Sequence, residues 1–213
     1  MEMSRPLRST SGMSVTAFPV FVGYDRREDA AYQVCRHSLI RNATTPLDIC
    51  PLIQDELRAN GLYTRGIDPL ASTDFTYTRF FVPYLTGYRG WAIFCDCDFL
   101  WLADIGDLIA AADDRYAAMC VHHDHRPTEK SKMDGQQQTL YPRKNWSSMI
   151  LFNCGHPANR VLTPDLANRE TGKYLHRFGW LEDELIGALP ETWNWLEGWS
   201  EMPEHGTPSA IHY

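Results

Sequence analysis

The 213-residue chain lacks an apolar segment of the length that crosses a membrane. No stretch approaches the roughly 20 apolar residues that a bilayer requires, and residues 1–17 contain no apolar core typical of a secretory signal. The chain also lacks an excess of positive charge, because 20 Lys and Arg stand against 27 Asp and Glu, a formal net charge of −7. Nucleic-acid-binding proteins usually carry a basic face. We therefore expect neither a transmembrane segment nor a nucleic-acid partner.

A Cys-x-x-Cys pair is also missing. The six cysteines are scattered, mostly in apolar stretches, so a zinc ribbon is not expected. Scattered apolar thiols are typical of reduced, buried cysteines. Together with the missing export signal, they predict a cytoplasmic location.

Length and composition predict one globular domain. A content of 44% hydrophobic and 22% charged residues excludes a wholly disordered chain. A chain of this length can build one substantial core. We expect residues 1–16 to be a flexible leader and residues 17–213 to form the domain.

The order of apolar stretches predicts an α/β fold. A strand over 18–24, a helix over 30–40 and a strand over 47–52 are the βαβ signature of a parallel sheet. Residues 122–145 are polar, have no apolar period and are predicted to be a long loop or a hairpin. Further helices are expected over 53–59, 76–84, 104–112, 164–170 and 180–189, and further strands before Asp96 and over 116–121 and 148–155.

Two aspartates, Asp96 and Asp98, follow the apolar residues 91–95. In an extended chain, side chains at i and i+2 point the same way. Two adjacent carboxylates repel each other and resist dehydration, so together they favour a cation. Carboxylate oxygens suit magnesium and manganese, which often bridge a protein to substrate phosphates. The pattern predicts a metal-dependent enzyme that acts on a phosphorylated substrate.

The order of motifs resembles the nucleotide-sugar glycosyltransferases of GT-A fold, most closely glycosyltransferase family 8 and its bacterial relatives. Asp96-Cys97-Asp98 matches their Asp-x-Asp metal motif. Four further segments are similar to the family pattern: 78–85 to its arginine-containing helix, 152–155 to its Phe-Asn-x-Gly strand end, 182–185 to its Asp-Gln helix start, and 211–213 to the segment with its third metal ligand. Glu184 stands where the family has glutamine. The printed sequence stops at Tyr213, so either the chain continues or His212 is not the equivalent histidine.

The resemblance implies a Rossmann-type mixed sheet, mostly parallel, flanked by helices in a single domain. It implies transfer of a sugar, with retention of anomeric configuration, from a nucleoside-diphosphate sugar, expected to be a UDP-sugar. The acceptor is left open as a saccharide, a lipid-linked sugar or a protein. By resemblance, Asp96, Asp98 and His212 hold Mn²⁺ or Mg²⁺, and a histidine ligand favours manganese.

The resemblance also implies roles for other side chains. Asp183 is the candidate for stabilising the oxocarbenium-like centre, or for serving as base or nucleophile. Arg79 suits an oxyanion of the donor diphosphate or a group of the sugar. Asn153, in contact with the transferred sugar, is the second catalytic candidate. The remaining donor-binding candidates are Tyr24 and Asp25 for base and ribose, Asp96 near the ribose and Glu184 beside Asp183.

Two other functions fit parts of the pattern. A phosphatase or phosphotransferase of haloacid-dehalogenase type would use Asp96 as a phosphorylated nucleophile, although that motif usually opens its fold. A non-catalytic module would bind a nucleotide sugar without turnover. Trp193, Trp195 and Trp199 could stack on sugar rings, but we expect them to close the core.

Overall fold

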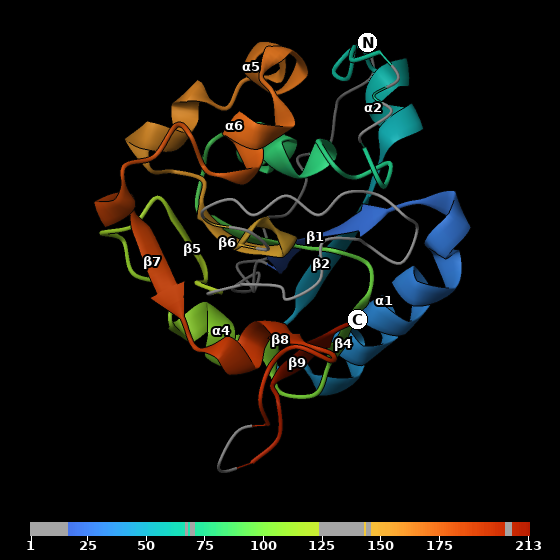
Figure 1. Cartoon of the computed structure of the whole chain (residues 1–213), viewed down its shortest axis with the longest axis vertical. Coiled ribbons are helices and arrows are strands. Elements are labelled where there is room, and N and C mark those ends of the chain that lie inside the picture. The colour runs from blue at the N-terminus through green and yellow to red at the C-terminus, as the bar shows by residue number, and fades with distance from the viewer. Residues whose placement is uncertain (1–16, 67, 69–70, 124–142, 144–145, 203–205) are drawn as a thin grey trace, which may run out of the picture.

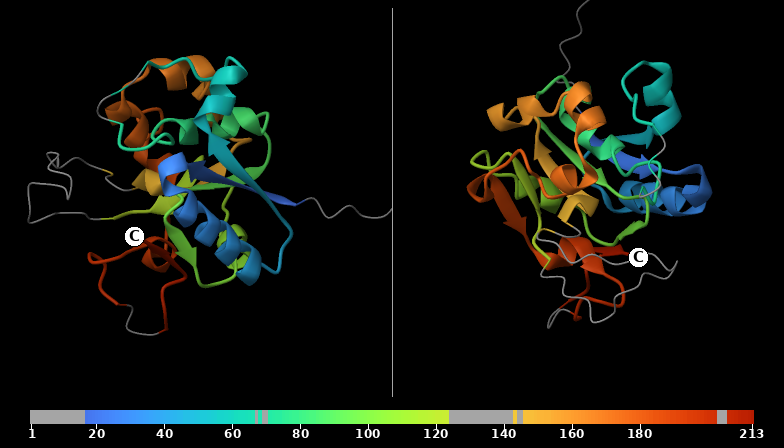
Figure 2. Two further views of the ribbon diagram at one scale, coloured as in Figure 1. Left: turned by 90° about the vertical axis from the view of Figure 1, so that its right-hand side faces the viewer. Right: turned by 45° about the horizontal axis from the view of Figure 1, so that its top comes forward.

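The computed structural model of the chain describes residues 17–66, 68, 71–123, 143, 146–202 and 206–213. The predicted leader over 1–16 and most of the predicted loop over 122–145 lie outside these ranges. The described residues form a six-stranded sheet and a smaller three-stranded sheet. Helices cover both faces of the larger sheet, with α5 and α6 on one side and α1 and α4 on the other (Figures 1 and 2).

The first half of the larger sheet is the predicted βαβ unit. Strand β1 (Phe18–Tyr24) pairs in parallel with β2 (Leu47–Ile53) and with β3 (Trp91–Cys95). Helix α1 (Asp29–Asn42) connects β1 to β2 and buries Leu39 against the core. Parallel strands need such a crossover because a tight hairpin can join only antiparallel neighbours.

The second half of the sheet contains one reversed strand. Strand β6 (Met149–Asn153) is antiparallel to β3 on one side and to β5 (Ala118–Val121) on the other. The edge strand β7 (Ile186–Leu189) is parallel to β5, which gives the order β2-β1-β3-β6-β5-β7. The sheet is therefore mixed and mostly parallel, as expected from the sequence. The reversal of β6 means that its first residue, not its last, lies beside the carboxyl end of β3.

The smaller sheet was not predicted from the sequence. It consists of β4 (Phe99–Trp101), β9 (Ala210–His212) and β8 (Trp195–Leu196), in the order β4-β9-β8. Phe99 pairs with His212 across β4 and β9. Strands of two or three residues are too short to show a hydrophobic period.

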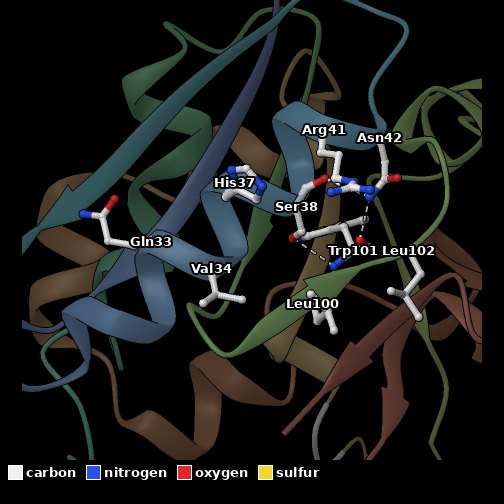
Figure 3. Close-up of a pocket in the computed structure, with 9 residues that line it drawn as sticks. All are labelled: Gln33, Val34, His37, Ser38, Arg41, Asn42, Leu100, Trp101 and Leu102. Carbon is white, nitrogen blue, oxygen red and sulfur yellow. Dashed lines mark hydrogen bonds between the residues drawn. The ribbon is translucent and has the colours of Figure 1, made fainter.

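Helix α1 covers the outer edge of β4 (Figure 3). The backbone N–H of Trp101 donates to Ser38 Oγ (3.1 Å), and Asn42 Nδ2 donates to the Trp101 carbonyl (2.8 Å). These side chains satisfy backbone groups that an edge strand would otherwise leave unpaired. A cavity of about 560 Å³ lies beside them, between α1 and β4, with the half-exposed side chains of Val34 and Leu102 at its wall.

The other helices are short and mostly lie where the sequence places them. The helix predicted over 76–84 is a 3₁₀ turn, η2 (Thr78–Phe81), followed by one turn of α3 (Val82–Leu85). Pro83 fits there because it stands in the first turn, where its missing N–H costs no helical hydrogen bond. The remaining α-helices are α2 (Gln54–Ala59), α4 (Ile105–Ala110), α5 (Pro164–Arg169) and α6 (Gly172–His176). The remaining 3₁₀ turns are η1 (Arg26–Glu28), η3 (Trp146–Ser148), η4 (Pro157–Val161), η5 (Asp183–Leu185) and η6 (Glu191–Asn194).

The helix predicted over 180–189 is wrong. This segment is the turn η5 followed by the strand β7, which pairs along β5. Ile186 and Leu189 are buried, and Gly187 is the strand partner of Met119, with no room for a Cβ beside Tyr116 and Met119. Pairing with a neighbouring strand thus overrides the local helical pattern, which is a common reason for such errors.

The tryptophan prediction is partly confirmed. Trp193 and Trp195 are buried, as expected of residues that close a core. Trp199 is 53% exposed and lies outside it. Within the described ranges, no helix has the length and apolar character to span a bilayer.

The assignment of β7 can be tested with Gly187→Ala. A Cβ at Gly187 would lie 2.6 Å from Tyr116 Cδ2 and 2.8 Å from Met119 Cγ, so we expect a loss of about 1–3 kcal/mol in the free energy of unfolding. A helix here would instead gain up to about 1 kcal/mol from the same change. Urea denaturation measures the difference. Gly155→Ala is the control, because its Cβ would meet no atom closer than 3.6 Å; a stabilised Gly187→Ala would contradict the strand.

Candidate functional site

The two aspartates lie where β3 ends. The backbone N–H of Asp96 donates to the Ser148 carbonyl (2.8 Å), so the reversed strand β6 holds the first residue beyond β3. Cys97, between the aspartates, is fully buried, and its thiol donates to Glu28 Oε2 (3.1 Å). The alternation expected of an extended chain therefore places Cys97 in the interior and both carboxylates on the other side.

The small sheet brings His212 to the aspartates. Because Phe99 and His212 are paired strand residues, their rings stack with centroids 4.6 Å apart. His212 Nε2 lies 3.4 Å from Asp98 Oδ1. Candidate ligand atoms of Asp96, Asp98 and His212 all lie within 4.8 Å of one another. The three residues that the resemblance assigns to a metal thus form one cluster.

The electrostatics of this cluster favour a cation. Asp96 Oδ1 and Asp98 Oδ1 are both buried; Asp98 Oδ1 accepts no hydrogen bond, and Asp96 Oδ1 is ion-paired with Arg79. Burial raises the pKa of Asp96 to about 8, and the neighbouring Asp98 carboxylate adds to this rise while Arg79 opposes it. Burial likewise raises the pKa of Asp98 to about 6. A buried carboxylate oxygen that accepts no hydrogen bond is costly, and a divalent ion shared by both carboxyl groups would offset that cost.

His212 has the protonation state that a metal ligand needs. Burial, followed by the nearby Arg79 charge, lowers the pKa of His212 to about 4. The imidazole is therefore neutral at pH 7 and carries a lone pair on one nitrogen. Two carboxylate oxygens and one imidazole nitrogen suit manganese and other divalent transition ions.

Arg79 points into the interior. Its guanidinium Nη1 lies 2.9 Å from Asp96 Oδ1 and donates to the Ser147 carbonyl (2.7 Å), while Nε donates to the Phe75 carbonyl (3.3 Å). Only 6% of the side chain is exposed. The geometry gives Arg79 a contact with a candidate metal ligand. Its expected contact with a donor remains a prediction.

Tyr24 and Asp25 lie at the carboxyl ends of β1 and β2, beside a cavity of about 350 Å³. This is the edge at which open α/β sheets bind ligands. Asp25 is buried, ion-paired with Arg27 (2.6 Å) and bound by the backbone N–H of Asp74 (3.2 Å). The hydrogen bonds from the Arg27 side chain are the main reason why the pKa of Asp25 is lowered to about 2. Asp25 therefore holds Arg27 and the backbone of Asp74 together, and all three residues line the cavity.

Asn153 is not brought to this edge. It pairs with Trp91 at the opposite end of β3, which at about 3.3 Å per residue is roughly 16 Å from Asp96 along the strand. Its backbone N–H donates to the Ala117 carbonyl, and its own carbonyl accepts from Asn159 Nδ2 (2.8 Å). The Phe-Asn-Cys-Gly match placed Asn153 in the site because the sequence does not reveal that β6 runs antiparallel to β3.

Asp183 and Glu184 also lie outside the metal cluster. Both belong to η5, which precedes the amino end of β7, and both are exposed. Asp183 forms an ion pair with Arg143, whose Nη1 donates to the carbonyl of Phe178 (3.2 Å). The expected roles of both acidic residues on the donor remain predictions.

Sequence reasoning missed three buried polar residues beside the cluster. Ser147 accepts from Arg79, Ser148 accepts from Asp96, and Asn194 binds His212 Nδ1 through its Oδ1 (3.1 Å). The sequence signal that could have found them is the presence of polar residues within apolar stretches. Ser147 and Ser148 directly precede β6, and Asn194 stands between the buried Trp193 and Trp195. The cavity of Figure 3 is separate from this site, since none of the three candidate metal ligands lines it.

Comparison with known proteins supplies the family. No family model matches the chain. It is 55% identical over 199 residues to "Protein CDI" of Arabidopsis thaliana, a match that covers 92% of this chain and 77% of that protein. The chain belongs to the Protein CDI family. That name carries no statement of activity.

Solved structures show the fold of this CDI-family chain. The bifunctional glycosyltransferase WbbM aligns over 96% of the chain, with a TM-score of 0.63 and 16% identity, and the chain spans 47% of WbbM. The galactosyltransferase LgtC, solved in complex with donor and acceptor sugar analogues, aligns over 92% of this chain and 87% of its own, with a TM-score of 0.55 and 10% identity. At such identities the likeness shows the fold alone, which is that of the GT-A-type glycosyltransferases.

The charge imbalance at the cluster predicts opposite effects of two isosteric changes on the protein without metal. At about pH 9, above the raised pKa values of both aspartates, Asp98→Asn removes a charge whose Oδ1 accepts no hydrogen bond. The Asp98 side chain is 37% exposed, so solvent screens that charge and we expect only a rise in Tm on the order of 2–4 °C, equivalent to about 1 kcal/mol. At the same pH, Asp96→Asn removes the counter-ion of buried Arg79, so we expect a loss of about 3 kcal/mol, the lower end for a broken buried pair because two carbonyls still accept from Arg79.

Thermal unfolding at about pH 9 in excess chelator measures both variants of this pair. Each serves as the control for the other, because both replace one carboxylate oxygen by an amide nitrogen. A lowered Tm for Asp98→Asn would show that its carboxylate has a stabilising partner in the metal-free protein.

Proposed function

We propose that the chain is a metal-dependent glycosyltransferase that moves a sugar from a nucleoside-diphosphate sugar to an acceptor. The observation that carries the proposal is the cluster of Asp96, Asp98 and His212 at the carboxyl end of β3, within a fold shared with glycosyltransferases. Acidic clusters occur without ions in many proteins. The buried Asp98 Oδ1, which accepts no hydrogen bond, lies beside the buried carboxyl group of Asp96, and this is what favours an ion here.

The proposed chemistry follows from the leaving group. When the bond between sugar and diphosphate breaks, negative charge grows on the departing phosphate oxygen. A divalent ion, when bound, would supply Lewis-acid stabilisation of that diphosphate. Asp96 and Asp98 would offer oxygen ligands, and His212 would offer Nε2. Manganese is the proposed ion because the ligand set mixes carboxylate with imidazole.

The cavity beside Tyr24 supports a nucleotide as part of the donor. It lies at the carboxyl ends of β1 and β2, on the same edge of the sheet as Asp96. The Tyr24 ring is held by an edge-on contact with Tyr32 (5.3 Å) and by a hydrogen bond from its hydroxyl to Asp29 Oδ1 (3.1 Å). A fixed aromatic ring in a polar cavity is suited to stack on a base. Uridine is the proposed base, and family 8 the proposed enzyme family, from the resemblance of the motifs.

Asp183 is the proposed carboxylate for the positive charge that develops at the transferred sugar. Its side chain is 83% exposed and paired with Arg143, so the pairing is open to solvent. Glu184 is proposed to contact the same donor sugar. Retention at the anomeric carbon remains part of the proposal. All six cysteines are free thiols, which supports the proposed cytoplasmic location.

The first test of the proposal is calorimetry of UDP binding. We expect UDP to bind in the presence of Mn²⁺ and to bind at least tenfold more weakly in excess chelator, because the diphosphate would lose its bridge to the two carboxylates. Asp98→Asn is the matched control and should bind UDP equally in both buffers. Equal affinity of the wild-type chain in both buffers would contradict the metal bridge.

The second test is turnover of a panel of nucleotide sugars with Mn²⁺. We expect slow hydrolysis of the accepted donor by the wild-type chain, its loss in Asp98→Asn, and a fall of at least 100-fold in Asp183→Asn, since each change removes charge that is proposed to act on the breaking bond. Chromatographic detection of free UDP measures the rates.

The outcomes of the turnover test separate the competing functions. Donor binding without any release of UDP would indicate the non-catalytic binding module. Hydrolysis of a phosphate monoester with capture of phosphate on Asp96 would indicate the phosphatase. The ion pair between Asp96 and Arg79 disfavours the phosphatase, because Asp96 Oδ1 is buried against the guanidinium.

A further inference from the structure

We propose that Asn194 is a positioning residue, which fixes His212 in the Nδ1–H tautomer so that the lone pair of Nε2 faces Asp98. The inference deepens the proposed function, because it concerns the orientation of a candidate metal ligand. The hydrogen bonds around the imidazole carry the inference.

The first observation is the contact on Nδ1. Asn194 Oδ1 lies 3.1 Å from His212 Nδ1, and an amide oxygen can only accept a hydrogen bond. This contact is therefore a hydrogen bond only when the proton resides on Nδ1. Asn194 has no solvent exposure, and its Nδ2 donates to Ser148 Oγ (2.8 Å), which uses the other end of the amide and holds its oxygen toward the imidazole.

The second observation is on the opposite nitrogen. His212 Nε2 lies 3.4 Å from Asp98 Oδ1, yet that oxygen accepts no hydrogen bond. A proton on Nε2 would therefore make no hydrogen bond to Asp98 Oδ1. A lone pair on Nε2 would instead be free to bind an ion that Asp98 also binds. The stacked Phe99 ring, at an interplanar angle of 17°, limits tilting of the imidazole.

The third observation links the two halves of the cluster. Ser148, the partner of Asn194, also accepts from the backbone N–H of Asp96 through its carbonyl (2.8 Å). Asn194 and Ser148 therefore connect the histidine of β9 to the first aspartate after β3. Metal-bound histidines commonly donate their other N–H to an oxygen that sets the tautomer. A neutral amide serves this purpose without adding a third negative charge beside Asp96 and Asp98.

The direct test is the tautomer of His212, read from two-bond ¹H–¹⁵N correlations of histidine-labelled protein at neutral pH, with His212→Ala to assign the signal. We expect the Nδ1–H form in the wild-type chain. Asn194→Leu keeps a similar volume but removes the acceptor, and should shift His212 toward the Nε2–H form. Asn194→Asp restores an acceptor and should restore Nδ1–H. An Nε2–H form in the wild-type chain, which is measurable whatever the variants do, would overturn the inference.

A second readout is the affinity for Mn²⁺, measured by electron paramagnetic resonance titration. Asn194→Leu should weaken binding about 10- to 100-fold, the range for groups that orient metal ligands. In a His212→Ala background the same change should alter affinity by no more than about twofold, because Asn194 would act only through His212. Equal losses in both backgrounds would show a general structural role and would overturn the inference.

Failure of this inference and failure of the proposed function give different results. A wild-type chain that binds no Mn²⁺ would contradict the proposed metal site whatever its tautomer. The other outcome is that the wild-type chain binds Mn²⁺ and that Asn194→Leu changes neither the His212 tautomer nor the Mn²⁺ affinity. That outcome would retain the proposed metal site and overturn the role of Asn194.

Discussion

The burial of two neighbouring carboxyl groups is the constraint on which the rest of this site depends. Asp96 and Asp98 leave the central strand together, and Asp98 Oδ1 accepts no hydrogen bond. Arg79 forms an ion pair with Asp96, whereas the group nearest Asp98 Oδ1 is the neutral imidazole of His212. Folding without an ion therefore costs free energy at this point, and any divalent ion that binds recovers it. The proposed metal-binding role of Asp98 and the stability of the metal-free protein are therefore opposed.

Two distant segments of the chain make this arrangement possible. The reversed strand β6 brings Ser147 and Ser148 beside the end of β3, where their carbonyls accept from Arg79 and Asp96. The small sheet brings His212 from the last residues of the chain onto Phe99. Neither segment is near the aspartates in sequence, so the cluster forms only when both sheets are assembled. The fold, which is that of GT-A-type glycosyltransferases, brings this cluster and the cavity beside Tyr24 to the same edge of the larger sheet.

The sequence by itself determined the parts whose pattern is local. The β1–α1–β2 unit follows from apolar stretches of the right length, and the shared direction of Asp96 and Asp98 follows from the period of an extended chain. Tertiary structure decided the parts that depend on strand pairing. It made Ile186–Leu189 a strand against β5 although its local pattern was helical, and it turned Arg79 inward. The direction of β6, which no local pattern encodes, put Ser148 and not Asn153 beside Asp96, because reversing a strand exchanges the residues at its two ends.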